Sequence, residues 1–207
     1  MHLRRLLSCV LVVLVLVLVN GAAPAEARTQ VYLLRGIFNV SVGLDALAAK
    51  FRRMGVAATV YGHGESGSVA SEAIRDYRAH KVGSIVLIGH SLGATAAAGV
   101  AEQLKNAGIP VSVLITLDGA STMAVPSNVR RAVNFHVDRG QITPGPGFRG
   151  SLQNINLNRV PGMDHMAIQA TPAMHRRIMG YVGGSGGGTM RAHSAPQEDK
   201  PAAEPAS

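Results

Sequence analysis

The chain has 207 residues, a formal net charge of +8 and no tryptophan, and aromatic residues make up only 4% of it. Its basic residues are scattered and not interleaved with aromatics, which argues against a nucleic-acid-binding surface or a stacking platform for bases or sugars. A basic excess of this kind fits a loose association with an anionic envelope surface.

The first 27 residues have the pattern of a secretory signal peptide. The segment Met1–Arg5 is basic, and the almost wholly apolar run Leu6–Val19 follows it. Ala25-Glu26-Ala27 then matches the A-x-A pattern of a cleavage site. Because the apolar run is shorter than the ~20 residues of a spanning helix, we expect cleavage after Ala27 and a periplasmic or secreted protein. A retained signal anchor is the alternative.

The two ends of the chain frame one predicted domain. Cleavage of residues 1–27 removes Cys9, the one cysteine, so no disulfide bond is expected in the mature protein. Residues 183–207 are rich in Gly, Pro and Ala and have no apolar periodicity, which is typical of a disordered tail. Residues 28–182 are therefore predicted to form a single domain, which we expect to be a monomer.

Apolar strands alternate with amphipathic helices along this domain. The predicted strands are Gln30–Leu34, Val56–Tyr61, Ser84–Ile88, Pro110–Leu117, Ala132–Val137 and Leu152–Leu157. The predicted helices are Gly43–Met54, Val69–His80, Leu92–Asn106 and Thr171–Tyr181. This alternation indicates an α/β fold, with a mostly parallel sheet and helices on both faces. Reactive groups are then expected at the carboxyl ends of the strands.

The pentapeptide Gly89-His90-Ser91-Leu92-Gly93 follows the third predicted strand directly and leads into a predicted helix. A strand, a sharp turn and a helix around G-x-S-x-G form a nucleophile elbow, in which the serine has a strained backbone. The serine hydroxyl is then exposed at the carboxyl end of the sheet, and the positive end of the helix helps to stabilise an oxyanion. We therefore predict that Ser91 is a catalytic nucleophile.

A serine hydroxyl needs an adjacent base, which a third group orients. His136 lies inside a predicted strand, where a core or surface histidine is the simpler interpretation. His175 lies in the last predicted helix beside Arg176, and we expect it to face solvent. His165 lies in a loop between the last strand and the last helix, and the chain order Ser, acid, His fits a nucleophile elbow. His165 is therefore the predicted base.

The acid is left open between two aspartates. Asp118 ends the strand after the elbow unit at a tight switch from strand to loop, which favours a partly buried carboxylate aimed across the strand ends. Asp138 ends the next predicted strand in a polar loop, where aspartate is often a turn former. We favour Asp118 and keep Asp138 as the alternative. Asp164, adjacent to His165, is expected to point away from the imidazole.

An oxyanion hole requires two backbone N–H groups. One is expected from Leu92, directly after the predicted nucleophile. The other is expected from the loop after the first strand, where Gly36 allows close approach and the Ile37 N–H is the favoured donor. His63 and Glu65 lack a second ligand pair with zinc-like spacing, so no metal is predicted.

Four parts of this pattern together resemble the α/β-hydrolase superfamily, and within it small bacterial exported lipase-like and thioesterase-like proteins. They are Arg35-Gly36, Gly89-His90-Ser91-Leu92-Gly93, Asp118 and Gly162-Met163-Asp164-His165. The resemblance extends from Val31 to Tyr181. It implies a Ser-His-Asp triad, an acyl-enzyme intermediate and no cofactor, and in the thioesterase-like branch the acid follows the strand after the elbow.

Two features depart from that family pattern. Arg35 stands where the usual sequence has histidine, which is tolerable because the backbone does the binding. The short segment Thr143–Gly147 leaves almost no room for a lid, so a shallow and open acyl pocket is expected. The sequence therefore predicts a hydrolase acting on a small-molecule ester or thioester. A non-catalytic envelope or binding protein with the same fold is the alternative.

Overall fold

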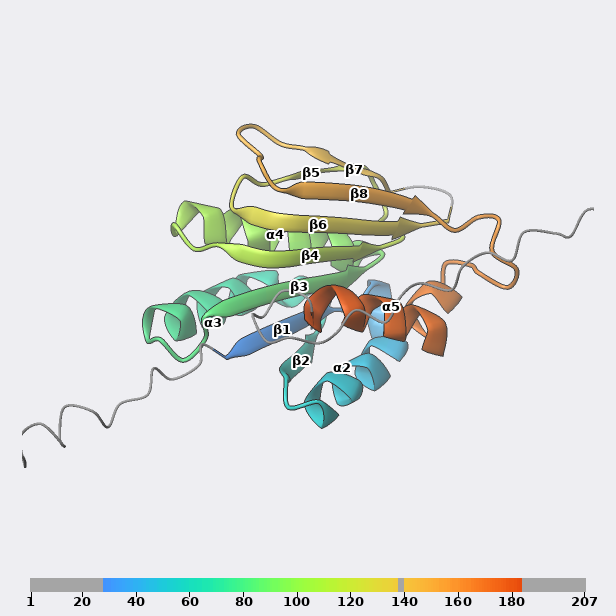
Figure 1. Cartoon of the computed structure of the whole chain (residues 1–207), viewed down its shortest axis with the longest axis horizontal. Helices are drawn as coiled ribbons and strands as arrows, with labels where there is room; N and C mark the ends of the chain where they lie inside the picture. Colours follow the sequence, from blue (N-terminus) through green and yellow to red (C-terminus); the bar gives the residue numbers. More distant parts are fainter. Residues whose placement is uncertain (1–27, 138–139, 184–207) are drawn as a thin grey trace, which may run out of the picture.

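A six-stranded parallel sheet forms the centre of the protein, with the strand order β2-β1-β3-β4-β6-β8 (Figure 1). The computed structural model describes residues 28–137 and 140–183. The strands are β1 (Thr29–Leu34), β2 (Ala57–Tyr61), β3 (Ser84–His90), β4 (Val111–Leu117), β6 (Val129–His136) and β8 (Ser151–Asn156). The expected signal peptide and Asp138 lie outside the described residues, as does all of the expected tail except Gly183.

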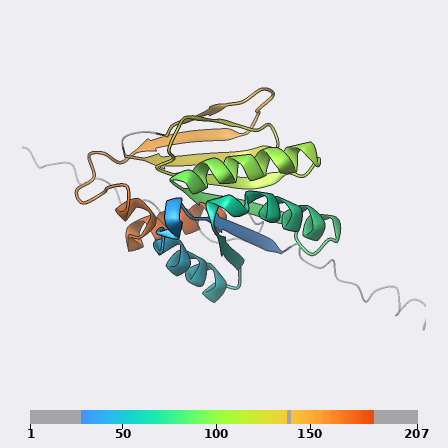
Figure 2. The same cartoon turned by 180° about the vertical axis from the view of Figure 1, so that it is seen from behind.

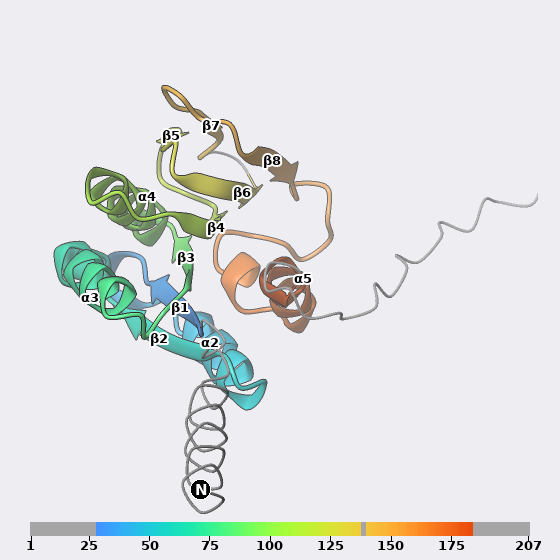
Figure 3. The ribbon, with the colours of Figure 1, turned by 60° about the vertical axis from the view of Figure 1, so that its left-hand side comes forward.

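Two layers of helices cover the sheet, as the alternating pattern predicts. Helices α3 (Ser66–Arg78) and α4 (Leu92–Asn106) pack on one face, which Figure 2 shows from behind. Helices α2 (Gly43–Arg53) and α5 (Pro172–Gly183) pack on the other, and Figure 3 separates the two layers. No helix among residues 28–137 and 140–183 is long and apolar enough to cross a membrane.

Strand β1 illustrates why continuous apolar runs become central strands. Its side chains alternate between the two faces, so that Tyr32 and Leu34 join the core under α3 and α4. Val31 and Leu33 join the core under α2 and α5. All four are fully buried, because a parallel strand covered on both faces has no solvent-facing side.

A small second sheet was not predicted. Strands β5 (Met123–Val125) and β7 (Ile142–Pro144) pair in parallel, so part of the expected Thr143–Gly147 loop is strand. The side chain of Asn154 in β8 fixes β7 by bonding both the N–H (2.9 Å) and the carbonyl (2.8 Å) of Ile142. Strands of three residues are too short to show alternation, and therefore this pairing leaves no periodic signal.

His175 is buried, and the expectation that it faces solvent is wrong. Its side chain is only 1% exposed. Lys50 Nζ of α2 donates to its Nδ1 (2.8 Å), and its Nε2 donates to the carbonyl of Gln169 (2.9 Å). His175 precedes the buried Ile178 by three positions, so both lie on the same helical face. The arginines that follow His175 in the sequence therefore do not indicate that His175 lies on the exposed face of α5.

Candidate active site

Ser91 lies in a sharp turn between β3 and α4 and has left-handed backbone angles, φ 57° and ψ −123°. The turn depends on the two flanking glycines. A Cβ on Gly89 would stand 2.1 Å from the carbonyl oxygen of Gly93, and one on Gly93 would stand 2.0 Å from that of Leu34. The pentapeptide therefore adopts the strained elbow that its sequence predicts, and Ser91 lies at the carboxyl end of the sheet.

Asp118 and His165 come together across the strand ends. Asp118 follows β4 and is 4% exposed, and its Oδ2 lies 2.6 Å from His165 Nδ1. Its Oδ1 accepts the Val137 N–H at 2.9 Å, so both carboxylate oxygens have partners. The Nδ1–H of a neutral imidazole donates to the carboxylate, and Nε2 is then left to accept a proton. The side chain of His165 is 46% exposed.

A buried polar chain holds the loop after β6 against the strand end that carries Asp118. Asn134 in β6 is fully buried, accepts from Thr116 Oγ1 (2.8 Å) and donates to the Gly140 carbonyl (2.8 Å). Gly140 packs so tightly that a Cβ there would stand 2.0 Å from the carbonyl oxygen of Gly119. The sequence reasoning missed Asn134, although an asparagine within the apolar run of β6 was the available signal.

The structure does not place the other two aspartates considered, Asp138 and Asp164, in a hydrogen bond with His165 among the described residues. Asp138, the alternative acid, lies outside the described residues. The Asp164 carboxylate accepts the N–H groups of Met166 (2.8 Å) and Ala167 (2.7 Å), and these bonds lower the pKa of Asp164. Asp164 therefore holds the turn that leads into the short helix η3 (Ala167–Gln169), whereas the described carboxylate bonded to His165 is Asp118.

Gly36 brings the loop after β1 against the nucleophile. A Cβ on Gly36 would stand only 3.0 Å from the Ser91 Cβ, so close approach is what this glycine provides. Its own N–H is already donated to Ser41 Oγ (2.9 Å) and is not available to an oxyanion. The N–H groups of Ile37 and Leu92 donate to no acceptor within residues 28–137 and 140–183. These two amides are the candidate oxyanion donors.

His90, directly before the nucleophile, is a site residue that the sequence reasoning did not consider. It is 1% exposed, and its ring lies 4.6 Å from the His165 ring between centroids. Its Nδ1 lies 2.7 Å from Ser41 Oγ, and its Nε2 lies 2.8 Å from the His165 carbonyl oxygen. Burial lowers the pKa of His90 to about 4, so the ring is neutral at physiological pH.

No hydrogen bond joins Ser91 Oγ to His165 in the described part of the chain. The two residues are nevertheless neighbours, because the His165 ring lies against the residue that precedes Ser91. Hydrogen bonds of this kind often tighten only when substrate is bound. Within the described ranges, no three His, Cys, Asp or Glu side chains are grouped to hold a metal ion.

Exposed apolar side chains line the loop beside the candidate oxyanion hole. Phe38 is 85% exposed, Val42 is 68% exposed, and Ile37 and Val40 are each nearly half exposed. Phe38 also has a left-handed backbone, with φ 52°. We call residues 37–42 the apolar loop. It gives an open apolar surface that directly follows Gly36, the residue packed against Ser91.

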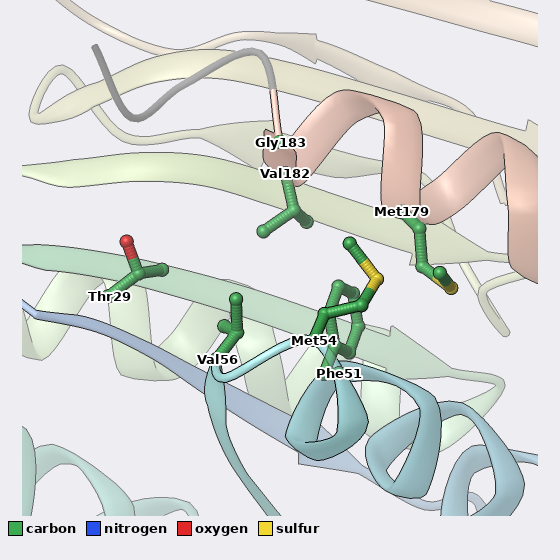
Figure 4. A pocket seen from close by; sticks show the side chains of 7 residues that line it. All are labelled: Thr29, Phe51, Met54, Val56, Met179, Val182 and Gly183. Carbon is green, nitrogen blue, oxygen red and sulfur yellow. The ribbon is translucent and has the colours of Figure 1, made fainter. Parts of the chain in front are cut away.

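A small apolar cavity of about 140 Å³ lies elsewhere, between the end of α2, the start of β1 and the end of α5 (Figure 4). Thr29, Met54 and Met179 are among its lining residues. Thr29 begins β1, whereas the site lies beyond the last residue of that strand, Leu34. The cavity is therefore at the opposite end of the sheet from Ser91.

Comparison with known proteins gives a family match over most of the chain. The model of a family described as "Alpha/beta hydrolase family" matches residues 16–201. No curated protein sequence matches the chain significantly.

Three solved structures illustrate the structural similarity. The NocB thioesterase domain, solved as a covalent complex with a fluorophosphonate nocardicin G analog, is 13% identical with a TM-score of 0.50, covering 80% of this chain and 97% of that one. The RedJ thioesterase of the prodiginine pathway in Streptomyces coelicolor is 14% identical with a TM-score of 0.49, covering 79% and 92%. A putative α/β-superfamily hydrolase from Xanthomonas campestris pv. campestris is 19% identical with a TM-score of 0.42, covering 74% and 99%.

Proposed function

The chain belongs to the α/β-hydrolase family, and on that premise we propose that it is a serine hydrolase cleaving an ester or a thioester through an acyl-enzyme intermediate. The observation that carries this proposal is the contact between His165 and the buried Asp118, formed beside the Ser91 elbow. A nucleophile, a base and a group that orients the base are the parts that acyl transfer requires.

In the proposed reaction, Ser91 Oγ attacks the substrate carbonyl and its proton passes to His165 Nε2. Asp118 stabilises the imidazolium that forms, while the N–H groups of Ile37 and Leu92 bind the oxyanion. The intermediate collapses, and the alcohol or thiol leaves with the proton held by His165. Water then repeats the sequence on the acyl-enzyme and releases the acid. Each oxyanion donor of this kind contributes about 10²–10³ in kcat.

The apolar loop supports a substrate with an apolar acyl group. Its side chains lie open to solvent next to Ile37, whose N–H is a candidate oxyanion donor. An acyl chain lying on this surface would remove apolar area from water, at about 25 cal/mol per Å². The proposed substrate is therefore a small-molecule acyl ester or thioester.

We also propose that the protein is exported, with cleavage of the first 27 residues after Ala27, and that it works as a monomer. The basic n-region, apolar run and A-x-A site support export. Residues 28–207 contain 18 Lys and Arg against 11 Asp and Glu, and this net charge of +7 supports a loose association with an anionic envelope surface.

Covalent labelling tests the serine mechanism against a non-catalytic member of the fold. A fluorophosphonate probe should label the wild-type protein once, and Ser91→Ala should remove the label. Ser71→Ala, which changes an exposed serine in α3, is the matched control and should keep it. Failure of the wild type to react, or labelling that survives Ser91→Ala, would favour the non-catalytic alternative.

A series of p-nitrophenyl esters of rising chain length, beside acyl-CoA thioesters, then identifies the substrate class.

A further inference from the structure

We propose that His90 is a positioning residue whose single tautomer ties the loop carrying the oxyanion donor to the loop carrying the base. This inference rests on the proposed function, since it assigns a role within the same site. We call Arg35–Val42, which includes the apolar loop, the oxyanion loop. We call Pro161–Met166 the base loop. The chemistry of each hydrogen-bond partner fixes the direction of the whole chain of bonds between them.

The first fixed point is at the base loop. His90 Nε2 lies 2.8 Å from the backbone carbonyl oxygen of His165. A carbonyl oxygen only accepts, so Nε2 must carry the hydrogen. A neutral imidazole has one N–H, and therefore Nδ1 holds a lone pair. His90 is thus restricted to the Nε2–H tautomer.

The second fixed point is at the oxyanion loop. Ser41 is fully buried, and its Oγ accepts the N–H of Gly36 at 2.9 Å. The same Oγ lies 2.7 Å from His90 Nδ1, which has no hydrogen to give in this tautomer. The Ser41 hydroxyl therefore donates to Nδ1. The bonds run in one direction, from Gly36 through Ser41 and His90 to the His165 carbonyl.

Protonation or loss of the ring would break this chain. A hydrogen on Nδ1 would leave the single Ser41 hydroxyl hydrogen without an acceptor in a fully buried position, which is costly. The burial of His90, which lowers its pKa to about 4, keeps the ring neutral and agrees with this geometry. The link is therefore intact over the pH range in which a histidine base works.

The link matters because few contacts hold the base. The His165 side chain is 46% exposed, and Asp118 bonds only its Nδ1. His90 supplies two more restraints, through the bond to the His165 carbonyl and through a ring contact with 4.6 Å between centroids. At its other end the chain reaches Gly36, which directly precedes the Ile37 donor. Base and oxyanion donor are thus set relative to each other by the residue next to the nucleophile.

Substitutions at His90 can separate the two ends of the link. His90→Gln places an amide N–H near the former Nε2 and retains the bond to the base loop. His90→Asn places an amide oxygen near the former Nδ1 and retains the bond to Ser41. His90→Leu retains neither. Because a misplacement of about 1 Å can cost about 10² in rate, we expect His90→Leu to lower kcat about 100-fold and to change KM less than about threefold.

The conservative variants should recover part of that loss, with His90→Gln keeping kcat within about tenfold of wild type because the base stays in place. Ser41→Ala, which cuts the link from the other side, should lower kcat in wild type but add little to His90→Leu. This non-additivity is the signature of one connected unit.

His175→Leu is the matched control for His90→Leu. His175 is equally buried, and it also accepts at Nδ1, from Lys50 of α2, and donates from Nε2 to a backbone carbonyl, that of Gln169 in η3, but it bonds neither His165 nor the oxyanion loop. Its substitution measures the cost of losing a buried neutral histidine and should leave kcat of the folded protein unchanged. A kcat for His90→Leu no lower than that of His175→Leu, per folded molecule, would overturn the proposal. Should His90→Leu not fold, His90→Asn, which loses the bond to the base loop, and Ser41→Ala carry the same comparison.

Imidazole nitrogen NMR on the wild-type protein gives a readout that needs no turnover. The expected spectrum shows His90 in the Nε2–H tautomer, unprotonated down to about pH 5, with the signal of its Nδ1 changed in Ser41→Ala. An Nδ1–H tautomer or a ring protonated at pH 6 would refute the link. If the wild-type protein fails to react with a fluorophosphonate while the Nε2–H tautomer is observed, it is the proposed function that fails and not the geometry.

Discussion

Gly36 and Ser91 lie in contact across the candidate site, so close that a Cβ on Gly36 would stand 3.0 Å from the Ser91 Cβ. Residues that follow two neighbouring strands, β1 and β3, thus meet at the carboxyl edge of the sheet. The contact leaves no room for a side chain between the nucleophile and the candidate donor Ile37.

We expect Gly36→Ala to lower kcat about tenfold or more and to destabilise the fold by about 1 kcal/mol, because the loop must shift to admit the methyl group. Gly99→Ala in α4 is the control, since a Cβ there meets nothing within 4 Å. It should leave kcat unchanged and raise the free energy of unfolding by about 0.5–1 kcal/mol. Ester hydrolysis and urea denaturation measure both effects, and an unaffected kcat in Gly36→Ala would speak against Ile37 as a donor.

Asp118→Asn should reduce kcat by about 10⁴, the scale seen when a triad aspartate is neutralised and the imidazole takes the wrong tautomer. Ser91→Ala and His165→Ala should abolish hydrolysis to a similar degree, because triad members act as a unit. Asp164→Asn is the control, since the Asp164 carboxylate accepts the N–H groups of Met166 and Ala167 and, among the described residues, makes no hydrogen bond to the His165 ring.

Asp138→Asn tests the alternative acid and should lower kcat only slightly. Steady-state kinetics on one activated ester is sufficient for all of these variants. A strong loss in Asp138→Asn with a mild one in Asp118→Asn would move the acid one strand along. Equal and mild losses in both would favour the non-catalytic alternative.

Phe38→Gly tests the apolar loop as an acyl-binding surface. The side chain is 85% exposed and its backbone has φ 52°, so glycine removes apolar contact area while relieving backbone strain. We expect KM for long-chain esters to rise about tenfold, KM for acetate esters to stay the same, and stability to rise by about 1 kcal/mol. Met54→Ala, at a half-exposed residue at the other end of the sheet, should change neither KM. Equal effects on short and long chains would exclude this surface as the acyl site.

Stability should fall as the pH is lowered from about 6.5 to about 4. Burial lowers the pKa of His90 from 6.5 to about 4 and also lowers that of His175, so the unfolded chain binds more protons than the folded one in this range. The stabilisation by the neutral buried histidines is complete above the pKa of histidine in the unfolded chain. It is lost as the pH falls towards the lower pKa of the same histidines in the folded protein. For His90 it is on the order of 3 kcal/mol. Urea denaturation at a series of pH values measures it, and His90→Gln should flatten the dependence.

Export predicts a mature protein that begins at or near Arg28 outside the cytoplasm. The described structure begins at that residue, so the mature chain would keep every strand and helix described above. Amino-terminal sequencing of protein from the envelope and the medium tests this. A protein that starts at Met1 in the membrane fraction would show that the apolar segment is a retained anchor.

The sequence alone determined the features that depend on neighbours along the chain. The apolar runs predict the six main strands, and α4 has the predicted bounds Leu92–Asn106. The strand, turn and helix around Ser91 follow from a single pentapeptide and its flanks. Each of these is local, because hydrophobic periodicity and glycine sterics act over a few residues.

Only the tertiary structure decided which distant groups meet. Asp118 contacts a histidine 47 residues away, and His90 joins partners that lie 49 and 75 residues from it. The burial of His175 and the pairing of β5 with β7 also depend on residues that are distant in the sequence and adjacent in the fold. Such contacts follow from the order of the strands and the close packing of loops at one edge of the sheet. No sequence window contains both partners, so no local pattern records them.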